Sequence, residues 1–409
     1  MIEIKGKYNT AKVYTDMVEE TAVSQIITLL NEQTFKDSKI RIMPDVHAGK
    51  GCTIGFTADM GDMVIPNLIG VDIGCGMMTT SIDISKENID FQKLDNVIRE
   101  KIPHGHNIHS GRVKKFSAIK DLNCLRDISV RGWSAAKWER QVGTLGGGNH
   151  FIELSTDKED NVYLILHSGS RHLGKSVADY YQNLAIELRS GKEEFFTAKD
   201  KLIKKFKSEG KKHLIQSEIK KLDKEYKRKT PDVPKDLCYL TGKYRDMYLH
   251  DMNIAQKFAF INRETMTDII MKEMNWKVIK SFQTIHNYIS FEDNIIRKGA
   301  VSANTGEQLL IPLSMAHGSL LCIGKGNTEW NCSAPHGAGR KFSRSRAKKE
   351  IDMADYINAM EGIYSTSVNQ ATLDEAPQAY KDPSEIIENI GETVEVVSML
   401  KPFYNFKSS

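Results

Sequence analysis

The spacing of apolar and polar positions along the 409 residues changes several times, which predicts a mixture of helices and strands. Ile2 to Ile4 predicts a short strand. Near-helical spacing then predicts an amphipathic helix through Ala22, Ile26, Ile27, Leu29 and Leu30. Apolar runs at 53–56 and 63–65 predict further strands. The N-terminal region therefore combines strands with at least one helix.

Two apolar runs farther along the chain each lead to a histidine. Asn161–Leu166 predicts a buried strand that ends in His167-Ser-Gly-Ser-Arg171. Val278–Phe282 predicts a strand shortly before His286. Residues that follow a strand often belong to an active site, although a core histidine bonded to the backbone fits the same pattern. Both alternatives stay open from the pattern alone.

The C-terminal half contains further predicted elements. Residues 252–270 read as a buried helix with Ala255, Phe258, Ala259 and Ile261 on its apolar side. Pro312 predicts a loop over 311–315. A final helix is predicted over 383–400, followed by a tail that contains Lys407.

The stretch 201–230 is rich in lysine and poor in aromatic residues. It predicts one or two exposed helices, which form an arm inserted between chemistry-bearing segments at about 175–245. A run of charges is usually a solvated face. The alternative is a surface that follows nucleic-acid phosphates.

Glycines surround two further groups of polar residues. Asp72 and Cys75 stand three residues apart among Gly70, Gly74 and Gly76. Three successive glycines also precede Asn149 and His150. Such segments turn sharply and expose backbone N–H groups, which suits close approach to a metal or a phosphate.

Composition limits the class of protein only weakly. The net charge of +4 neither requires nor excludes a nucleic-acid partner. Six cysteines are scattered without a C-x-x-C pair, as expected in a reducing compartment. We see no N-terminal signal pattern and no apolar run long enough to cross a bilayer, so we expect a cytoplasmic protein with no membrane partner.

The chemistry-bearing residues spread over almost the whole chain, so we expect one large domain, residues 1–409, with an inserted helical arm. One carboxylate, one thiol and three imidazoles suit two adjacent divalent ions with a bridging thiolate. Ligand type alone favours zinc over manganese. This set comprises Asp72, Cys75, His150, His167 and His286.

His336 lies outside that set and is followed by Arg340. It is a candidate general acid/base or a nucleophile toward phosphorus. The glycine-rich segments and many Lys and Arg residues favour phosphate as the group acted on. No G-x-x-x-x-G-K-[ST] motif is present, which argues against an ordinary NTPase. The residues thus predict metal-dependent phosphoryl or nucleotidyl transfer.

Five motifs in order resemble the RtcB RNA ligases, from about residue 43 to the C-terminus: Val71-Asp-Ile-Gly-Cys-Gly76, Gly148-Asn-His-Phe-Ile-Glu153, His167-Ser-Gly-Ser-Arg171, His286-Asn-Tyr288 and His336-Gly-Ala-Gly-Arg340. The resemblance implies joining of RNA 3′-phosphate or 2′,3′-cyclic phosphate ends to 5′-hydroxyl ends. GTP and Mn(II) would be required, and the resemblance implies a fold of α+β class. Manganese would then replace the zinc that ligand type favours.

The resemblance also implies residue roles. Asp72, Cys75, His150, His167 and His286 would hold two manganese ions, and His336 would carry GMP. Tyr380 would stack on guanine, and Lys407 would contact its edge. Arg171 and Arg340 would contact RNA. The remaining GTP contacts would come from Asn149, His150, Phe151, Ile152, Glu153, His286, Asn287, Pro312, Leu313, Ser314, Met315, Ser319, Gly337, Ala338 and Gly339.

The sequence departs from the family in one loop. Leu313 and Ala316 stand where the family usually has glycine, and His317 follows. Lys407 is followed by Ser408 and Ser409. An RNA ligase of tRNA splicing or RNA repair is the leading interpretation. A self-guanylylating enzyme that caps or repairs other nucleic-acid 3′-phosphate ends is the alternative, and a non-catalytic RNA-binding homologue is a third. The RNA substrate, the oligomeric state and the need for an activating protein partner stay open.

Overall fold

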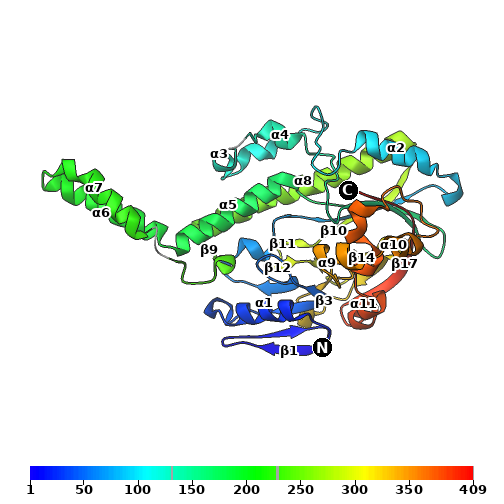
Figure 1. Cartoon of the computed structure of the whole chain (residues 1–409), viewed down its shortest axis with the longest axis horizontal. Helices are drawn as coiled ribbons and strands as arrows, with labels where there is room; N and C mark the ends of the chain where they lie inside the picture. Colours follow the sequence, from blue (N-terminus) through cyan, green and yellow to red (C-terminus); the bar gives the residue numbers. More distant parts are fainter. Residues whose placement is uncertain (130–131, 227–229, 409) are drawn as a thin grey trace.

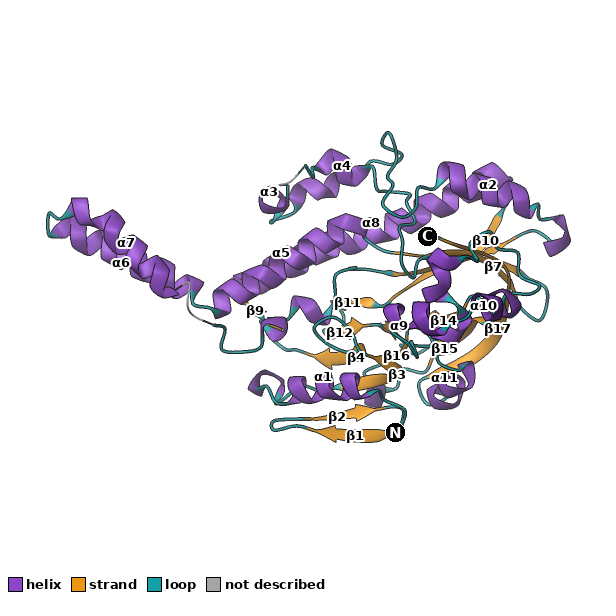
Figure 2. Cartoon of the chain, viewed as in Figure 1, coloured by secondary structure: helices purple, strands orange, loops and turns teal. Residues whose placement is uncertain are grey.

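Seven antiparallel strands form the larger sheet of the computed structural model, which describes residues 1–129, 132–226 and 230–408 (Figure 2). The strands lie in the order β10-β6-β8-β7-β17-β15-β14. The central strands are nearly all buried because the sheet is covered on both faces. The strand bounds are β6 (Gly76–Ile82), β7 (Phe151–Thr156), β8 (Val162–Ser168), β10 (Val278–Ile285), β14 (Gln308–Ser314), β15 (Gly318–Gly324) and β17 (Val394–Lys407).

A six-stranded sheet in the order β1-β2-β3-β4-β12-β11 lies beside it. Its strands are β1 (Ile2–Lys5), β2 (Thr10–Val13), β3 (Arg41–His47), β4 (Ile54–Asp59), β11 (Asn287–Ile289) and β12 (Ile295–Lys298). β10 of the larger sheet ends at Ile285, and β11 of the smaller sheet begins at Asn287. His286 is therefore the single residue between β10 of the larger sheet and β11 of the smaller sheet.

Two short strand pairs complete the β structure: β13 (Ala300–Ser302) with β16 (Ser333–Pro335), and β5 (Met63–Val64) with β9 (Leu240–Thr241). Helix α1 (Glu20–Leu30) covers the smaller sheet with Ala22, Ile26, Leu29 and Leu30, as the sequence predicts. Ile27 is 37% exposed and lies outside that apolar face.

A long helix pair, α5 (Arg171–Arg189) and α8 (Gly242–Met274), runs across the body (Figure 1). α8 contains the predicted 252–270 helix and buries Ala255, Phe258 and Ala259.

The other helices of the body are α2 (Phe91–Lys101), α3 (Leu125–Ile128), α4 (Ala135–Glu139), α9 (Arg344–Glu350), α10 (Met353–Ala359) and α11 (Pro383–Ile390). Short 3₁₀ turns are η1 (Gln33–Phe35), η2 (Pro66–Leu68), η3 (Lys86–Asn88), η4 (Ser117–Asp121), η5 (Lys212–Leu214), η6 (Lys235–Leu237), η7 (Thr328–Trp330), η8 (Gln370–Glu375) and η9 (Pro377–Ala379).

Helices α6 (Lys192–Ser208) and α7 (Ile215–Tyr226) leave the body as a hairpin, here called the arm (residues 192–226; Figure 1). No described residue of the arm is buried. The lysine-rich segment was predicted over 201–230, of which 227–229 fall outside the described residues. The wider predicted insertion of 175–245 includes the arm together with most of α5, which packs in the core.

Two sequence-based expectations are wrong. Residues 311–315 are not a loop, because β14 runs through Ser314 with an irregular register between Pro312 and Ser314. Proline is tolerated there since β14 is an edge strand, where a missing N–H breaks little pairing.

The predicted helix over 383–400 stops early. α11 ends at Ile390, and residues 394–407 form β17, the strand between β7 and β15. The β-branched residues Val394, Val396 and Val397 favour a strand after the turn at Gly391. Lys407 thus lies on a central strand, 5% exposed, and not on a free tail.

The mixture of sheets and helices in one body confirms the predicted α+β class. Among the described residues, no helix combines the length and apolarity needed to span a bilayer.

Candidate metal and nucleotide site

A thiol and two imidazoles from different elements meet in the core. Cys75 lies in the turn before β6, His150 just before β7, and His167 near the end of β8. The Cys75 Sγ lies 3.4 Å from His150 Nε2 and 3.3 Å from His167 Nε2. All three side chains are buried, and their donor atoms lie within 4.8 Å of one another. These residues form a group that could hold a metal ion.

Asp72 and His286 extend this group on two sides. Asp72 Oδ2 lies 3.1 Å from His150 Nε2, and His286 Nε2 lies 3.1 Å from His167 Nε2. The five residues that the sequence singles out are therefore contiguous in space. Cys75 lies between the two ends of the set, as a bridging ligand requires.

The backbone selects the imidazole tautomers that metal binding needs. His150 Nδ1 faces the Leu145 carbonyl at 2.9 Å, and His167 Nδ1 faces the Asn149 carbonyl at 3.2 Å. A carbonyl only accepts, so it favours a proton on Nδ1 and an Nε2 lone pair that points toward Cys75; at His150 the Arg171 guanidinium, which only donates, lies 3.1 Å from the same Nδ1 and opposes this preference. Burial lowers the pKa of His150 and, more strongly, of His167, which keeps both rings neutral. The donor set thus fits a bound divalent ion.

Tight backbone approaches hold Asp72 and Cys75 in place. A Cβ added at Gly76 would lie 2.3 Å from the Thr284 carbonyl on neighbouring β10. A Cβ at Gly169 would lie 2.2 Å from Asp72 Oδ1. Glycine is required at both positions because any side chain would displace a neighbouring strand or the carboxylate.

Two buried polar residues of α8 support the same loops. Arg263 Nη1 donates to the carbonyls of Gly74 at 2.8 Å and Ser168 at 2.7 Å. Asn262 Oδ1 accepts from the N–H groups of Gly143 and Thr144. The sequence interpretation missed both residues. Their signal is an adjacent Asn and Arg within a helix that is otherwise apolar at this point.

His336 lies beside this set, directly after β16. Its ring centroid is 4.7 Å from that of His286. His336 Nδ1 contacts Asp45 Oδ2 at 2.6 Å, and the same oxygen accepts from the His336 backbone N–H at 3.1 Å. Asp45 is fully buried. Donation from Nδ1 to Asp45 leaves Nε2 unprotonated and nucleophilic.

Asp45 is a third residue to which the sequence interpretation gave no role. It lies on β3 of the smaller sheet and reaches His336 across 291 positions of sequence. The Pro44-Asp-Val-His47 segment forms the end of β3. His47 lies 6.5 Å from His336, ring to ring. Burial lowers the pKa of His47 to about 4.

A cavity of about 710 Å³ opens next to His336 and the histidines. Its volume lies within the range of small-molecule sites. Most of the expected GTP-contacting residues line it: Asn149, Phe151, Glu153, His286, Asn287, Pro312, Leu313, Ser314, Met315, His336, Gly337, Ala338, Gly339, Tyr380 and Lys407. His150, Ile152 and Ser319, also expected at GTP, are buried away from that lining.

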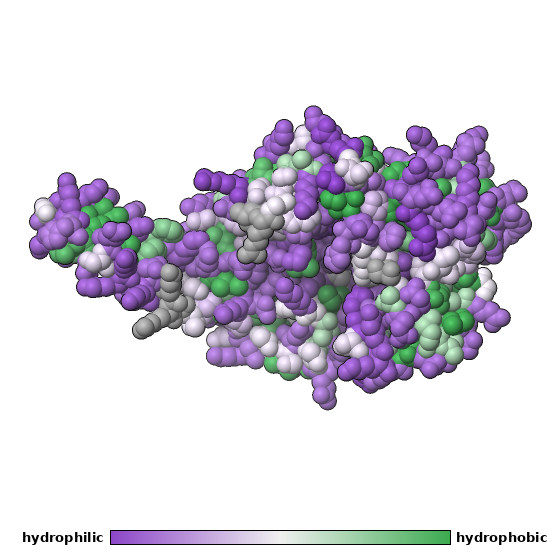
Figure 3. Space-filling model, turned by 45° about the horizontal axis from the view of Figure 1, so that its top comes forward, coloured by the Kyte–Doolittle hydropathy of each residue, from purple (hydrophilic) through white to green (hydrophobic). Residues whose placement is uncertain are grey.

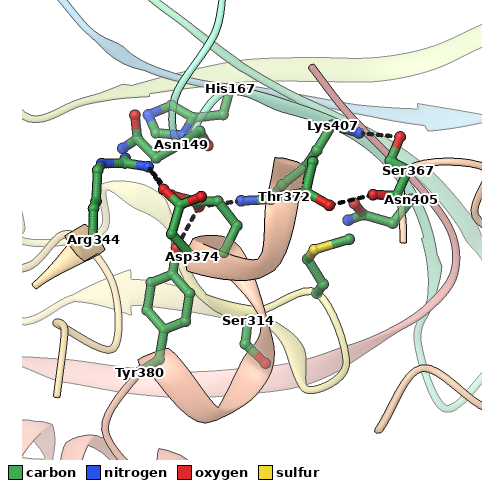
Figure 4. A network of polar contacts seen from close by, with 12 residues as sticks. Asn149, His167, Ser314, Arg344, Ser367, Thr372, Asp374, Tyr380, Asn405 and Lys407 are labelled. Atoms are coloured by element: carbon green, nitrogen blue, oxygen red, sulfur yellow. Dashed lines mark hydrogen bonds and ion pairs between the residues drawn. The ribbon is translucent and has the colours of Figure 1, made fainter. Parts of the chain in front are cut away.

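At one wall of the cavity, Arg344, Tyr380 and Lys407 belong to a polar network (Figure 4). The buried carboxylate of Glu375 connects these side chains. The Tyr380 hydroxyl donates to Glu375 Oε2 at 2.6 Å, and Lys407 Nζ pairs with the same oxygen. Arg340 Nη1 lies 3.2 Å from Glu375 Oε1. Arg344 pairs with both Asp374 and Glu375. The network fixes Tyr380 and Lys407 at the cavity.

The charges in this network determine the protonation of Glu375. Burial alone would raise the pKa of Glu375. The positive charges of Lys407, Arg344 and Arg340 outweigh burial and lower it to about 2. Glu375 and Arg344 were also missed from the sequence, because neither stands in a motif that signals a site.

The resemblance implies that Arg171 and Arg340 contact RNA, and the two side chains lie in different parts of the site. Arg340 lines the cavity, with its guanidinium 5.2 Å from the centre of the Tyr380 ring. Arg171 begins α5 behind the metal-ligand set, with Nη1 3.1 Å from His150 Nδ1. Its φ of 56° places it in the left-handed region. Contact of either side chain with RNA stays a prediction.

The segment that departs from the family, residues 313–317, lies at the cavity, which Leu313 lines. Leu313 is 2% exposed and packs in the apolar cluster with Ile311, Ile386 and Ile390. His317 contacts Ser314 Oγ through Nδ1 at 2.8 Å. Ala316, half-buried, packs against a second apolar cluster.

The protein thus has an α+β fold with a Cys–His group that could hold a metal ion. A cavity large enough for a nucleotide adjoins this group. Residues 29–408 match the family model described as tRNA-splicing ligase RtcB. The chain therefore belongs to the RtcB family.

Named relatives agree with this assignment. The RNA-splicing ligase RtcB of Escherichia coli K12 is 31% identical over 94% of this chain and 93% of its own length. The tRNA-splicing ligases RtcB of Nanoarchaeum equitans and Aeropyrum pernix are 27% and 26% identical, each over 85% of this chain and 83% of their own length.

Proposed function

We propose that this protein is an RNA ligase that uses GTP and manganese to join a 3′-phosphate or 2′,3′-cyclic phosphate end to a 5′-hydroxyl end. Membership of the RtcB family supports RNA ligation, and the site residues support the nucleotide step. The position of His336 is the observation that carries the proposal. This histidine lies at the wall of the cavity, bound to buried Asp45 and next to His286.

Asp72, Cys75, His150, His167 and His286 would hold the manganese ions. Bound there, divalent ions would neutralise phosphate charge and polarise the phosphorus–oxygen bonds. Cys75 in the middle of the set supports two ions that share one thiolate. All three imidazoles would ligate through Nε2.

The first step would be attack of the His336 Nε2 lone pair on the α-phosphorus of GTP. The new N–P bond forms as the bond to pyrophosphate breaks, and pyrophosphate leaves. The carboxylate of Asp45 holds the Nδ1 proton and stabilises the positive charge that develops on the ring. A phosphoramidate between His336 and GMP results.

A 3′-phosphate oxygen of RNA would then attack this phosphorus, and the N–P bond breaks as His336 is released. The RNA now carries an activated 3′ end. The 5′-hydroxyl of the second strand attacks the RNA phosphorus, loses its proton and expels GMP. A 2′,3′-cyclic phosphate end would first be opened by water to a 3′-phosphate.

The cavity wall suits guanine at the far end of the nucleotide. Tyr380 supplies a ring for stacking, and Lys407 supplies N–H donors for the acceptor edge of guanine. Both are fixed by Glu375, so little side-chain freedom is lost on binding. This arrangement supports the expected roles of the two residues.

A joining assay tests the proposal. The protein, GTP and Mn(II) are incubated with two RNA strands, one ending in a 3′-phosphate and the other beginning with a 5′-hydroxyl. We expect a joined product that requires all components and that is lost in His336→Ala. Guanylylation of the 3′-phosphate without joining would favour the capping alternative, and joining by His336→Ala would overturn the mechanism.

A further inference from the structure

The positive charge of the chain is concentrated in the arm (residues 192–226). This segment contains eleven lysines and seven acidic residues, which gives a net +4. The whole chain also has a formal net charge of +4. Basic and acidic residues are therefore equal in number over the rest of the chain. The arm carries the whole excess of positive charge.

Most arm lysines make no ion pair with a carboxylate among the described residues. Ion pairs join Lys192, Lys211 and Lys221 to nearby glutamates. Within the described part of the chain, no carboxylate lies within ion-pair distance of the other arm lysines, which are Lys199, Lys201, Lys204, Lys205, Lys207, Lys212, Lys220 and Lys224. These ammonium groups are available to an anionic partner.

Their spacing along the helices places several on common faces. Lys201, Lys204 and Lys205 are exposed on α6 at i, i+3 and i+4, so they share one side of the helix. Lys220 and Lys224 are exposed at i and i+4 on α7. A row of cations on a helix suits a partner with regularly spaced negative charges, such as a phosphate backbone.

The apolar residues of the arm hold the hairpin together. The Phe195 and Tyr226 rings of the two helices lie 5.6 Å apart, centroid to centroid. Leu202 and Phe206 on α6 and Leu222 on α7 are only half-exposed. Figure 3 shows the arm as a mainly hydrophilic projection with small hydrophobic areas. Charge, more than apolar surface, is what the arm offers to a partner.

The base of the arm fixes its direction relative to the site. Arg189, the last residue of α5, donates through Nε to Asp232 at 2.9 Å and lies over the Tyr239 ring at 4.5 Å. The same helix begins at Arg171 beside the metal-ligand set. Nineteen residues at 1.5 Å each separate the two ends by about 28 Å.

We propose that the arm binds the phosphate backbone of RNA that extends outward from the ligation site and so favours long or structured RNA ends. This inference rests on the proposed function, because it takes RNA to be the molecule held at the site. A duplex rising roughly 3 Å per base pair needs about ten base pairs to cover 28 Å. Shorter RNA therefore does not reach the arm.

Two RNAs and two matched variants test this inference. One RNA is a six-nucleotide strand, and the other carries the same end on a 20-base-pair stem. Lys201→Gln, Lys204→Gln and Lys205→Gln are combined in the arm variant. Lys5→Gln, Lys36→Gln and Lys93→Gln are combined in the control, which loses the same charge at exposed positions elsewhere. Binding is measured by fluorescence anisotropy at several salt concentrations, without GTP.

We expect the arm variant to bind the long RNA about 10- to 100-fold more weakly near 0.1 M salt, with a salt slope shallower by roughly 2–3. Its affinity for the short RNA and its guanylylation should match the wild type. Equal losses with the short RNA or in the control variant would overturn the inference. Unchanged affinity of the arm variant for the long RNA would also overturn it. The arm would then face solvent or bind a protein.

The two proposals fail in different ways. If the wild type forms no adduct with GMP, the proposed function is wrong, whatever the arm does. If the adduct and joining are present but the affinity for the long RNA does not depend on the arm lysines, only the inference about the arm is wrong.

Discussion

Asp45 and His336, 291 positions apart in sequence, meet with Oδ2 and Nδ1 separated by 2.6 Å. The carboxylate is fully buried and also accepts from the His336 backbone N–H. It thus fixes both the ring orientation and the tautomer. The nucleophilicity of His336 Nε2 therefore depends on a residue of the smaller sheet.

Asp45→Asn should slow guanylylation about 100-fold or more. The amide removes the negative charge that stabilises the charged ring, and it can favour the wrong tautomer. Adduct formation from labelled GTP is followed in single-turnover experiments. Asp37→Asn, at an exposed aspartate, is the matched control and should react like the wild type. An unimpaired rate in Asp45→Asn would show that the pair has no positioning role.

Loss of the Cys75 thiol should reduce the metal content of the protein. The wild type is expected to bind two manganese ions per chain, and Cys75→Ala at most one, because the proposed bridge is removed. The measurement is elemental analysis after dialysis against Mn(II), independent of activity. Cys332→Ala, at a half-exposed cysteine outside the set, serves as the control. Two ions bound by Cys75→Ala would contradict the bridging role.

Tyr380→Ala should weaken GTP binding by roughly 10- to 100-fold, since stacking on an aromatic ring contributes about 1–3 kcal/mol per base. Tyr380→Phe keeps the ring and loses only the hydrogen bond to Glu375. It should bind GTP within a few-fold of the wild type. Calorimetric titration gives both affinities. If the two variants lose affinity equally, the hydroxyl and not the ring is the important group.

The buried charge network predicts a dependence of stability on pH. The pKa of Glu375 is lowered from an ordinary 4.5 to about 2, so its ionised form stabilises the fold above pH 4.5. This contribution, about 3 kcal/mol, is lost as the pH falls from 4.5 to 2. Urea unfolding at several pH values should show a steeper acid loss for the wild type than for Glu375→Gln.

Glu350→Gln is the control for this measurement, because Glu350 pairs with Arg346 at the surface. It should keep the pH dependence of the wild type. Parallel curves for the wild type and Glu375→Gln would show that the network does not couple folding to protonation.

Sequence reasoning found the residues that stand in local motifs. Cys75, His150 and His167 were visible because each follows or precedes an apolar strand and has a glycine or serine within two residues. It did not find Asp45, Glu375 or Asn262, whose roles depend on contacts with distant segments. Such contacts arise from sheet pairing and helix packing, which a single sequence does not encode locally.

The errors in the fold have the same origin. Pro312 predicts a loop from local chemistry, but edge position in the sheet makes a strand possible. Residues 394–400 were assigned to a helix because the apolar spacing of 383–400 is ambiguous. Pairing with β7 and β15 determines that they form a strand. The α+β class that the resemblance implies is nevertheless correct, whereas the apolar patterns alone indicated only a mixture of helices and strands.

The most direct test of the proposed mechanism is to locate the guanylyl group on the protein. The wild type is incubated with labelled GTP and Mn(II) without RNA, digested under alkaline conditions and analysed by mass spectrometry. The mechanism predicts an acid-labile GMP adduct on His336 that is absent from His336→Ala. An adduct on another residue, or an equal adduct in His336→Ala, would contradict it.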